Sequence, residues 1–223
     1  MYFRMKIVID GNIGSGKTTQ LGLLEQKGWT VQREPIDKWP LKEFYKDPSR
    51  WAFLFHMIIL QTLRPVRTTT RHVIYERSLL SSRWVFWPVL RRQGHVTQLE
   101  HETYDHFYER FSWHPDVYIF LSKNLDLAWE HIQARGQAGD EGVTREYLAE
   151  LEKEYMDLVR SVPCKVYVVN ANQTVQKIHE DICKVLVDNE LLFSDLGGSQ
   201  VQKVGGRGRE VPCTPFTHMC NLS

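Results

Sequence analysis

One loop near the start of the chain constrains the fold more than any other feature. Residues 11–18 read Gly-Asn-Ile-Gly-Ser-Gly-Lys-Thr, which fits the pattern GxxxxGK[ST] in full. The loop follows a short apolar run at residues 6–10 and opens a segment with helical spacing at residues 17–26. In such a strand–loop–helix unit, backbone N–H groups and the helix N-terminus converge on a phosphate group. The motif therefore predicts an α/β fold with a nucleotide phosphate site at the end of its first strand.

The same loop indicates which residues would hold the nucleotide. Lys17 would neutralise the β- and γ-phosphates, and the Thr18 hydroxyl would hold Mg²⁺. We expect ATP to be bound by the loop and the first helical turn, namely Gly11, Asn12, Ile13, Gly14, Ser15, Gly16, Lys17, Thr18 and Thr19.

Strand-like and helix-like segments alternate along most of the chain. Short apolar runs predict strands at 6–10, 30–33, 72–75, 116–121 and 165–169. Helical spacing predicts helices at 17–26, 51–70, 78–92, 101–111, 125–134, 145–162 and 174–187. This alternation is typical of a doubly wound α/β fold, here a P-loop kinase fold with a five-stranded parallel sheet and helices on both faces.

Composition limits the remaining possibilities. The chain has 223 residues, and Lys+Arg 28 against Asp+Glu 27 gives a formal net charge of +1, so no nucleic-acid partner is expected. No apolar run approaches the roughly 20 residues that a membrane helix needs. The four cysteines lack CxxC or metal-ligand spacing, which favours a reduced, cytoplasmic protein. We expect one kinase domain over residues 1–188 and a disordered tail over residues 189–223, where periodicity ends.

Charged residues at the strand ends indicate what happens to the phosphate. Glu34 follows the second predicted strand, and Glu76 with Arg77 follows the third. Because ligands gather at the carboxyl ends of parallel strands, two carboxylates and a guanidinium should meet near the γ-phosphate. A kinase needs such a set, as a base, a Mg²⁺ partner and a cation for the transferred group. A GTP switch is excluded, because its NKxD base-reading motif is missing and the only DxxG string lies in the tail.

The helix predicted at residues 51–70 is the candidate acceptor pocket. Trp51, Phe55, Ile59 and Leu63 recur every four residues and form one apolar stripe. Such a stripe is also typical of plain core. His56 beside Phe55 favours a pocket, because a buried imidazole needs a polar partner. Phe55 could stack on a base while His56 hydrogen-bonds to its edge.

Taken together, these motifs resemble the deoxynucleoside kinase family, which contains deoxycytidine, deoxyguanosine, mitochondrial thymidine and insect multisubstrate kinases. The resemblance runs from about residue 6 to residue 188. It rests on the phosphate loop and on five further motifs, EPIDKW at 34–39, YKDPSRW at 45–51, ERS at 76–78, RG at 135–136 and EYL at 146–148.

The resemblance implies a role for each site residue. Glu34 would be the base for the 5′-hydroxyl, and Arg77 would hold that hydroxyl and the transferred charge. Glu76 and Thr18 would organise Mg²⁺. Residues 135–142 would form a lid with Arg135 over the ATP phosphates, and Asn172 and Thr174 would border the adenine. The nucleoside would contact Glu34, Trp39, Tyr45, Phe55, His56, Ile59, Leu63, Arg77, Ser82, Phe86 and Asp140. Family members are commonly homodimers.

Three departures from the family pattern affect specificity. His56 stands where members usually carry Gln, which leaves the base preference open. His131 and Gln137 replace lid arginines, so phosphate clamping is expected to be weaker. Leu63 and Ser82 stand where purine- and cytidine-preferring members carry Arg and Asp, which favours a pyrimidine substrate, thymidine included.

Two other functions remain open. A nucleoside monophosphate kinase such as thymidylate kinase shares the fold and the loop, although Glu34 would repel a substrate phosphate. A catalytically silent nucleotide-binding protein would be consistent with a lid that has few arginines. Such a protein would not need a base, a metal partner and a cation together.

Overall fold

The computed structural model describes residues 5–66, 72–136 and 140–189. The strands are β1 (Met5–Asp10), β2 (Val31–Gln32), β3 (His72–Glu76), β4 (Val117–Ser122) and β5 (Lys165–Asn170). The helices are α1 (Lys17–Gln26), α2 (Leu41–Lys46), α3 (Pro48–Thr62), α4 (Leu79–Ser81), α5 (Trp87–Arg92), α6 (Gln98–Phe111), α7 (Leu125–Arg135), α8 (Arg145–Ser161) and α9 (Val175–Asp188). Shorter turns are η1 (Ile36–Lys38), η2 (Ser82–Phe86) and η3 (Asp140–Gly142).

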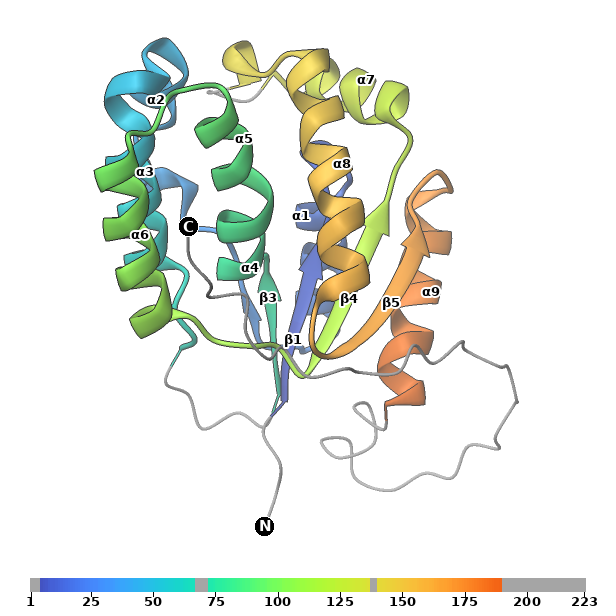
Figure 1. Ribbon diagram of the computed structural model, residues 1–223. Helices are drawn as coiled ribbons and strands as arrows, with labels where there is room; N and C mark the ends of the chain where they lie inside the picture. Colours follow the sequence, from blue (N-terminus) through green and yellow to red (C-terminus); the bar gives the residue numbers. More distant parts are fainter. Residues whose placement is uncertain (1–4, 67–71, 137–139, 190–223) are drawn as a thin grey trace.

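The strands form one parallel sheet in the order β2-β3-β1-β4-β5, which confirms the predicted five-stranded α/β fold. Alternate residues of β1 point to opposite faces of this sheet. Val8 belongs to a core shared with α3, α5, α6 and α8, whereas Ile7 and Ile9 belong to a core shared with α1 and α9. Figure 1 shows the helices covering the sheet accordingly. The inner strands β1, β3 and β4 are buried on both faces and mainly apolar, and polar groups gather at their carboxyl ends.

Two predicted helices differ from the structure by more than a few residues. The helix expected at 51–70 ends at Thr62, because Pro65 disfavours helical backbone in the residue before it; residues 67–70 lie outside the described ranges. The helix expected at 78–92 is divided into α4, the π-helical turn η2 and α5. Pro88 has no N–H to bond to the carbonyl of Trp84, which explains the altered hydrogen bonding there. The short helix α2 was not predicted.

Within the described ranges, no helix is long and apolar enough to cross a membrane. The predicted tail lies outside the described residues, apart from Asn189.

Candidate active site

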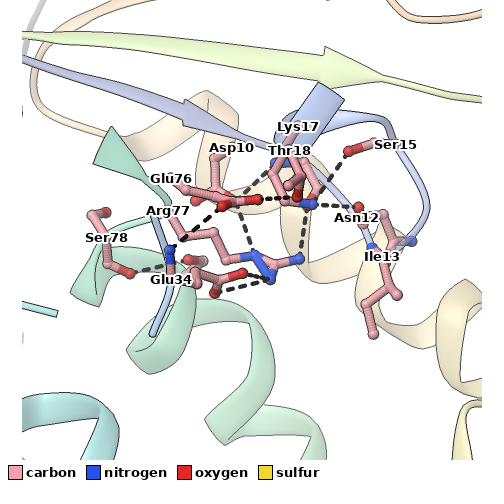
Figure 2. A network of polar contacts seen from close by, with 12 residues as sticks. Asp10, Asn12, Ile13, Ser15, Lys17, Thr18, Glu34, Glu76, Arg77 and Ser78 are labelled. Atoms are coloured by element: carbon pink, nitrogen blue, oxygen red, sulfur yellow. Dashed lines mark hydrogen bonds and ion pairs between the residues drawn. The ribbon is translucent and has the colours of Figure 1, made fainter. Parts of the chain in front are cut away.

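The glycine-rich loop lies where the sequence predicted it, between β1 and α1. Gly14 has φ +80°, and a Cβ built there would lie 2.4 Å from the carbonyl oxygen of Ala128 in α7, so only glycine fits. The buried Lys17 amine donates to the carbonyl oxygen of Asn12 at 2.8 Å (Figure 2) and to that of Gly11 at 2.9 Å. The carbonyl groups of the loop thus fix the position of the lysine amine.

The charged residues at the strand ends meet beside this loop. The Arg77 Nη1 atom donates to both carboxylate oxygens of Glu34, each at 3.2 Å (Figure 2). The Nη2 atom donates to the Gly11 carbonyl at 3.1 Å. Arg77 adopts φ 58°, a backbone conformation that costs about 1–3 kcal/mol and persists only where the surrounding structure enforces it. The strand order explains the meeting, since β3 lies between β2 and β1. The guanidinium therefore lies between Glu34 and the loop.

Asp10 completes this cluster and was missed by the sequence interpretation. Its side chain is fully buried and lies 3.4 Å from the Arg77 Nε atom. Tyr118 and Tyr155 each donate a hydroxyl hydrogen bond to it at 2.9 Å, and the Gly11 N–H donates at 2.8 Å. A signal was available, because Asp10 ends its strand as Glu76 does.

Burial shifts the protonation of the central groups. Desolvation raises the pKa of Glu34 to about 7, although Arg77 and Lys17 act in the opposite direction. Desolvation, with Arg77 as the second cause, lowers the pKa of Lys17 to about 7. A carboxylate with a raised pKa beside fixed cations is typical of an active-site base.

The two predicted magnesium ligands are in contact. The Thr18 hydroxyl donates to Glu76 Oε1 at 2.5 Å. Their oxygen atoms are the kind of donor that Mg²⁺ prefers. In the described part of the chain, no group of three or more His, Cys, Asp or Glu side chains could hold a metal. The donors present fit an ion that takes few protein ligands and completes its shell with phosphate and water.

A cavity of about 320 Å³ opens beside the cluster. All eleven residues predicted to contact the nucleoside line it, together with Lys17, Thr18, Glu76 and Arg135. The Phe55 ring stacks on Phe44 (centroids 4.5 Å apart, 13° between planes) and meets Trp39 edge-on. Phe44 was missed, because α2 was not predicted. The cavity is therefore apolar and aromatic at one end and charged at the other.

His56 lines the apolar end of the cavity and is 1% exposed. Its Nδ1 atom lies 3.0 Å from the Ser82 hydroxyl, which lies 3.0 Å from the Tyr104 hydroxyl. Burial lowers the pKa of His56 to about 3, so the ring is neutral at physiological pH. The partner that the sequence argument required is Ser82.

The described part of the predicted lid segment lines the cavity through Arg135 and Asp140. Arg135 and Asp140 form a two-pronged ion pair with hydrogen bonds of 2.8 and 2.7 Å. Gly142 packs directly on Tyr45, since a Cβ at this glycine would lie 2.2 Å from the Tyr45 Cβ. Gln137 lies outside the described residues.

Asn172 and Thr174 lie away from this cavity. The Asn172 side chain accepts a hydrogen bond from the Asn124 backbone, and Thr174 caps α9. Both therefore stabilise the loop after β5.

A charged cluster on a glycine-rich loop, at the carboxyl ends of a five-stranded parallel sheet, defines a P-loop kinase fold. The chain belongs to the deoxynucleoside kinase family, whose sequence profile matches residues 7–192. Protein 029R of Invertebrate iridescent virus 3 is 29% identical over 185 residues, covering 81% of this chain and 95% of that protein. Deoxycytidine kinase 2 of Gallus gallus is 26% identical over 240 residues, covering 86% and 88%. A deoxyadenosine kinase structure from M. mycoides superposes with a TM-score of 0.75 at 26% identity, covering 83% of this chain and all of that one.

The family membership gives the chain its class of activity. It is an ATP-using deoxynucleoside kinase, and its substrates are a deoxynucleoside and ATP.

Proposed function

We propose that this kinase moves the γ-phosphate of ATP to the 5′-hydroxyl of a pyrimidine deoxynucleoside, thymidine included. The observation that carries the proposal is the Glu34–Arg77 pair, which faces one cavity together with the phosphate-loop lysine. The reacting hydroxyl would thus meet a base and a cation beside the phosphate loop.

Each group in the cluster has a step it can perform. Glu34 takes the proton of the 5′-hydroxyl as its oxygen bonds to the γ-phosphorus. The bond from that phosphorus to the β,γ-bridging oxygen breaks, and ADP leaves with the electron pair. Arg77 lies between the base and the loop, where charge develops on the transferred group. Lys17 exchanges its loop carbonyls for the β- and γ-phosphates of ATP.

Mg²⁺ belongs to the same proposal. Thr18 and Glu76 would hold it, directly or through water, because their oxygens meet at the first turn of α1. When bound, it supplies charge neutralisation on the phosphate oxygens. At the same cavity, Arg135 would turn from Asp140 to the phosphates, and Asp140 and Tyr45 would contact the sugar 3′-hydroxyl. Asn172 and Thr174 would border the adenine.

The pyrimidine preference rests on the apolar end of the cavity. Leu63 and Ser82 are uncharged, and Ser82 is hydrogen-bonded to the neutral His56. Trp39, Phe55, Ile59 and Phe86 leave room for a flat ring between apolar walls. An acceptor that already carried a phosphate would meet Glu34, which argues against a monophosphate kinase.

A substrate panel tests the proposal. Purified full-length protein with Mg²⁺ and ATP is offered thymidine, deoxycytidine, deoxyadenosine, deoxyguanosine or thymidine monophosphate, and ADP release is measured. We expect turnover with the pyrimidine deoxynucleosides, thymidine included. Turnover only with purines would refute the base preference, and turnover only with the monophosphate would favour the thymidylate kinase alternative. ATP binding without any turnover would favour a catalytically silent protein.

The proposal also covers the oligomeric state, the location in the cell and the bounds of the folded domain. We propose a homodimer, a cytoplasmic location, and a folded domain over residues 1–188 with a separate tail over residues 189–223. Light scattering measures the oligomeric state, cell fractionation measures the location, and limited proteolysis shows whether cleavage begins near residue 189.

A further inference from the structure

The hydrogen-bond chain behind His56 determines which kind of contact this residue can offer to a base. The chain links side chains from three elements, His56 on α3, Ser82 in η2 and Tyr104 on α6, and all three are buried. Both links are 3.0 Å long. The neutral ring, the serine and the tyrosine carry three N–H or O–H protons, but only two hydrogen bonds join the three side chains. The third proton therefore either points into the cavity or has no acceptor.

The protons can be placed by elimination. If Nδ1 carried the proton and donated to Ser82, either the Ser82 or the Tyr104 proton would need another acceptor. Neither hydroxyl has one among the described residues. A buried hydroxyl without an acceptor lowers the population of such an arrangement by roughly one to two orders of magnitude. In the remaining arrangement, Tyr104 donates to Ser82, Ser82 donates to Nδ1, and Nε2 carries the ring proton.

The second ring nitrogen has a clear path to a ligand. Nε2 has no hydrogen-bond partner in the described ranges, and this atom is not fully buried. It is therefore open to the cavity that His56 lines. Edge-on contacts with Phe55, Trp87 and Tyr104, at centroid distances of 5.7, 5.2 and 5.8 Å, hold the ring in this orientation.

We propose that Ser82 fixes His56 as a hydrogen-bond donor, so that this position contacts an acceptor atom, and not a donor, on the edge of the base. Such atoms are the ring nitrogen N3 or carbonyl O2 of cytosine and the carbonyls O2 or O4 of thymine. The 4-amino group of cytosine and the N3–H of thymine, which are donors, are not contacted at this position. Cytosine and thymine both offer an acceptor, so one fixed donor admits both pyrimidines. The inference rests on the proposed function, because it takes this end of the cavity as the place of the base.

The protonation of the ring nitrogens is measured by NMR on the full chain labelled with ¹⁵N in histidine. Long-range ¹H–¹⁵N correlations distinguish a protonated from an unprotonated ring nitrogen, and a His56→Gln spectrum identifies the signal among nine histidines. At pH 7 we expect a protonated Nε2 and an unprotonated Nδ1. A protonated Nδ1 would overturn the proposal, whether or not the protein is an active kinase.

Two variants test Ser82 as the positioning residue. Ser82→Asp places an acceptor beside Nδ1, and the proton should move to Nδ1. Tyr104→Phe is the matched control, since it removes the other buried hydroxyl of the hydrogen-bonded trio and leaves Ser82 with His56 as its acceptor. Its tautomer should match the wild type. An inverted tautomer in Tyr104→Phe, or an unchanged one in folded Ser82→Asp, would overturn the role of Ser82.

Nucleoside addition tests the contact itself. Thymidine and deoxycytidine, each added without ATP, should move the Nε2–H signal downfield and leave Nδ1 unprotonated. We also expect Ser82→Asp to lower kcat/KM for both nucleosides about tenfold, the effect of one good hydrogen bond, with the KM for ATP unchanged. If nucleosides are phosphorylated but the His56 signal does not move, the base contact is refuted while the kinase activity stands. If no nucleoside is phosphorylated, the proposed function fails instead.

Discussion

Replacing Glu34 by glutamine separates chemistry from stability. The amide keeps the shape of the carboxylate and one oxygen for the Arg77 guanidinium, which now donates to both oxygens at 3.2 Å. It cannot accept the proton of the 5′-hydroxyl. Because general bases contribute about 10²–10⁴-fold, we expect kcat to fall by at least about 10²-fold, with the KM for the nucleoside changed by less than about threefold.

The stability of the same variant follows from the raised pKa of Glu34. The folded protein raises the pKa of Glu34 from 4.5 to about 7, so ionisation of Glu34 destabilises the fold as the pH rises through this range. At pH 8 the amide removes this cost, which is at most roughly 3 kcal/mol at about 1.36 kcal/mol per pKa unit. The attraction of Arg77 is already contained in this raised pKa, so its loss in the amide adds no separate cost. We therefore expect the Tm at pH 8 to match or exceed that of the wild type, by at most about 10 °C.

Single-turnover kinetics and calorimetry measure the two effects separately. Glu43→Gln, at an exposed glutamate of α2, is the matched control for removing one carboxylate. A Glu34→Gln enzyme with near-normal kcat would remove Glu34 from the role of base. A Tm lowered by more than about 10 °C would show instead that Glu34 is needed for folding.

Three further substitutions test other parts of the site. Lys17→Ala should abolish measurable turnover in the ADP-release assay, because this amine is the cation that the loop offers to the phosphates of ATP. An active variant would mean that Lys17 does not hold the phosphates. Asp10→Asn removes a buried charge beside Arg77 and should destabilise the protein by about 3–5 kcal/mol in urea unfolding; a loss below about 1 kcal/mol would show that Glu34 alone fixes Arg77. Gly142→Ala forces a methyl group against Tyr45 and should raise the nucleoside KM about tenfold with little change in kcat, whereas an unchanged KM would place Tyr45 away from the sugar.

Much of the site was predictable because its determinants are local or follow from strand topology. The loop motif needs only eight consecutive residues to specify its path. Glu34, Glu76 and Arg77 were found because the ends of parallel strands share one edge of a sheet. The family resemblance then identified Tyr45, Ser82 and Asp140, all of which line the cavity.

The remaining features depend on contacts that no short stretch of sequence contains. Tyr118 and Tyr155 lie 108 and 145 positions from Asp10, and both resemble ordinary core residues in the sequence. Tyr104 reaches Ser82 only because α6 packs against α3 and η2. Helix α2, which supplies Phe44, has only six residues, too few for a clear helical period.

The sequence by itself determined the class of fold, the phosphate loop and the acidic strand ends, because periodicity and turn chemistry act between near neighbours. Only the tertiary structure decided which polar groups are charged, which are neutral and which face the cavity. The pKa values of Glu34 and His56 depend on burial and on side chains from distant elements, and burial exists only after the layers have packed. The likeness to the deoxynucleoside kinase family thus depends on short motifs, whereas the protonation states of Glu34 and His56 depend on the folded protein.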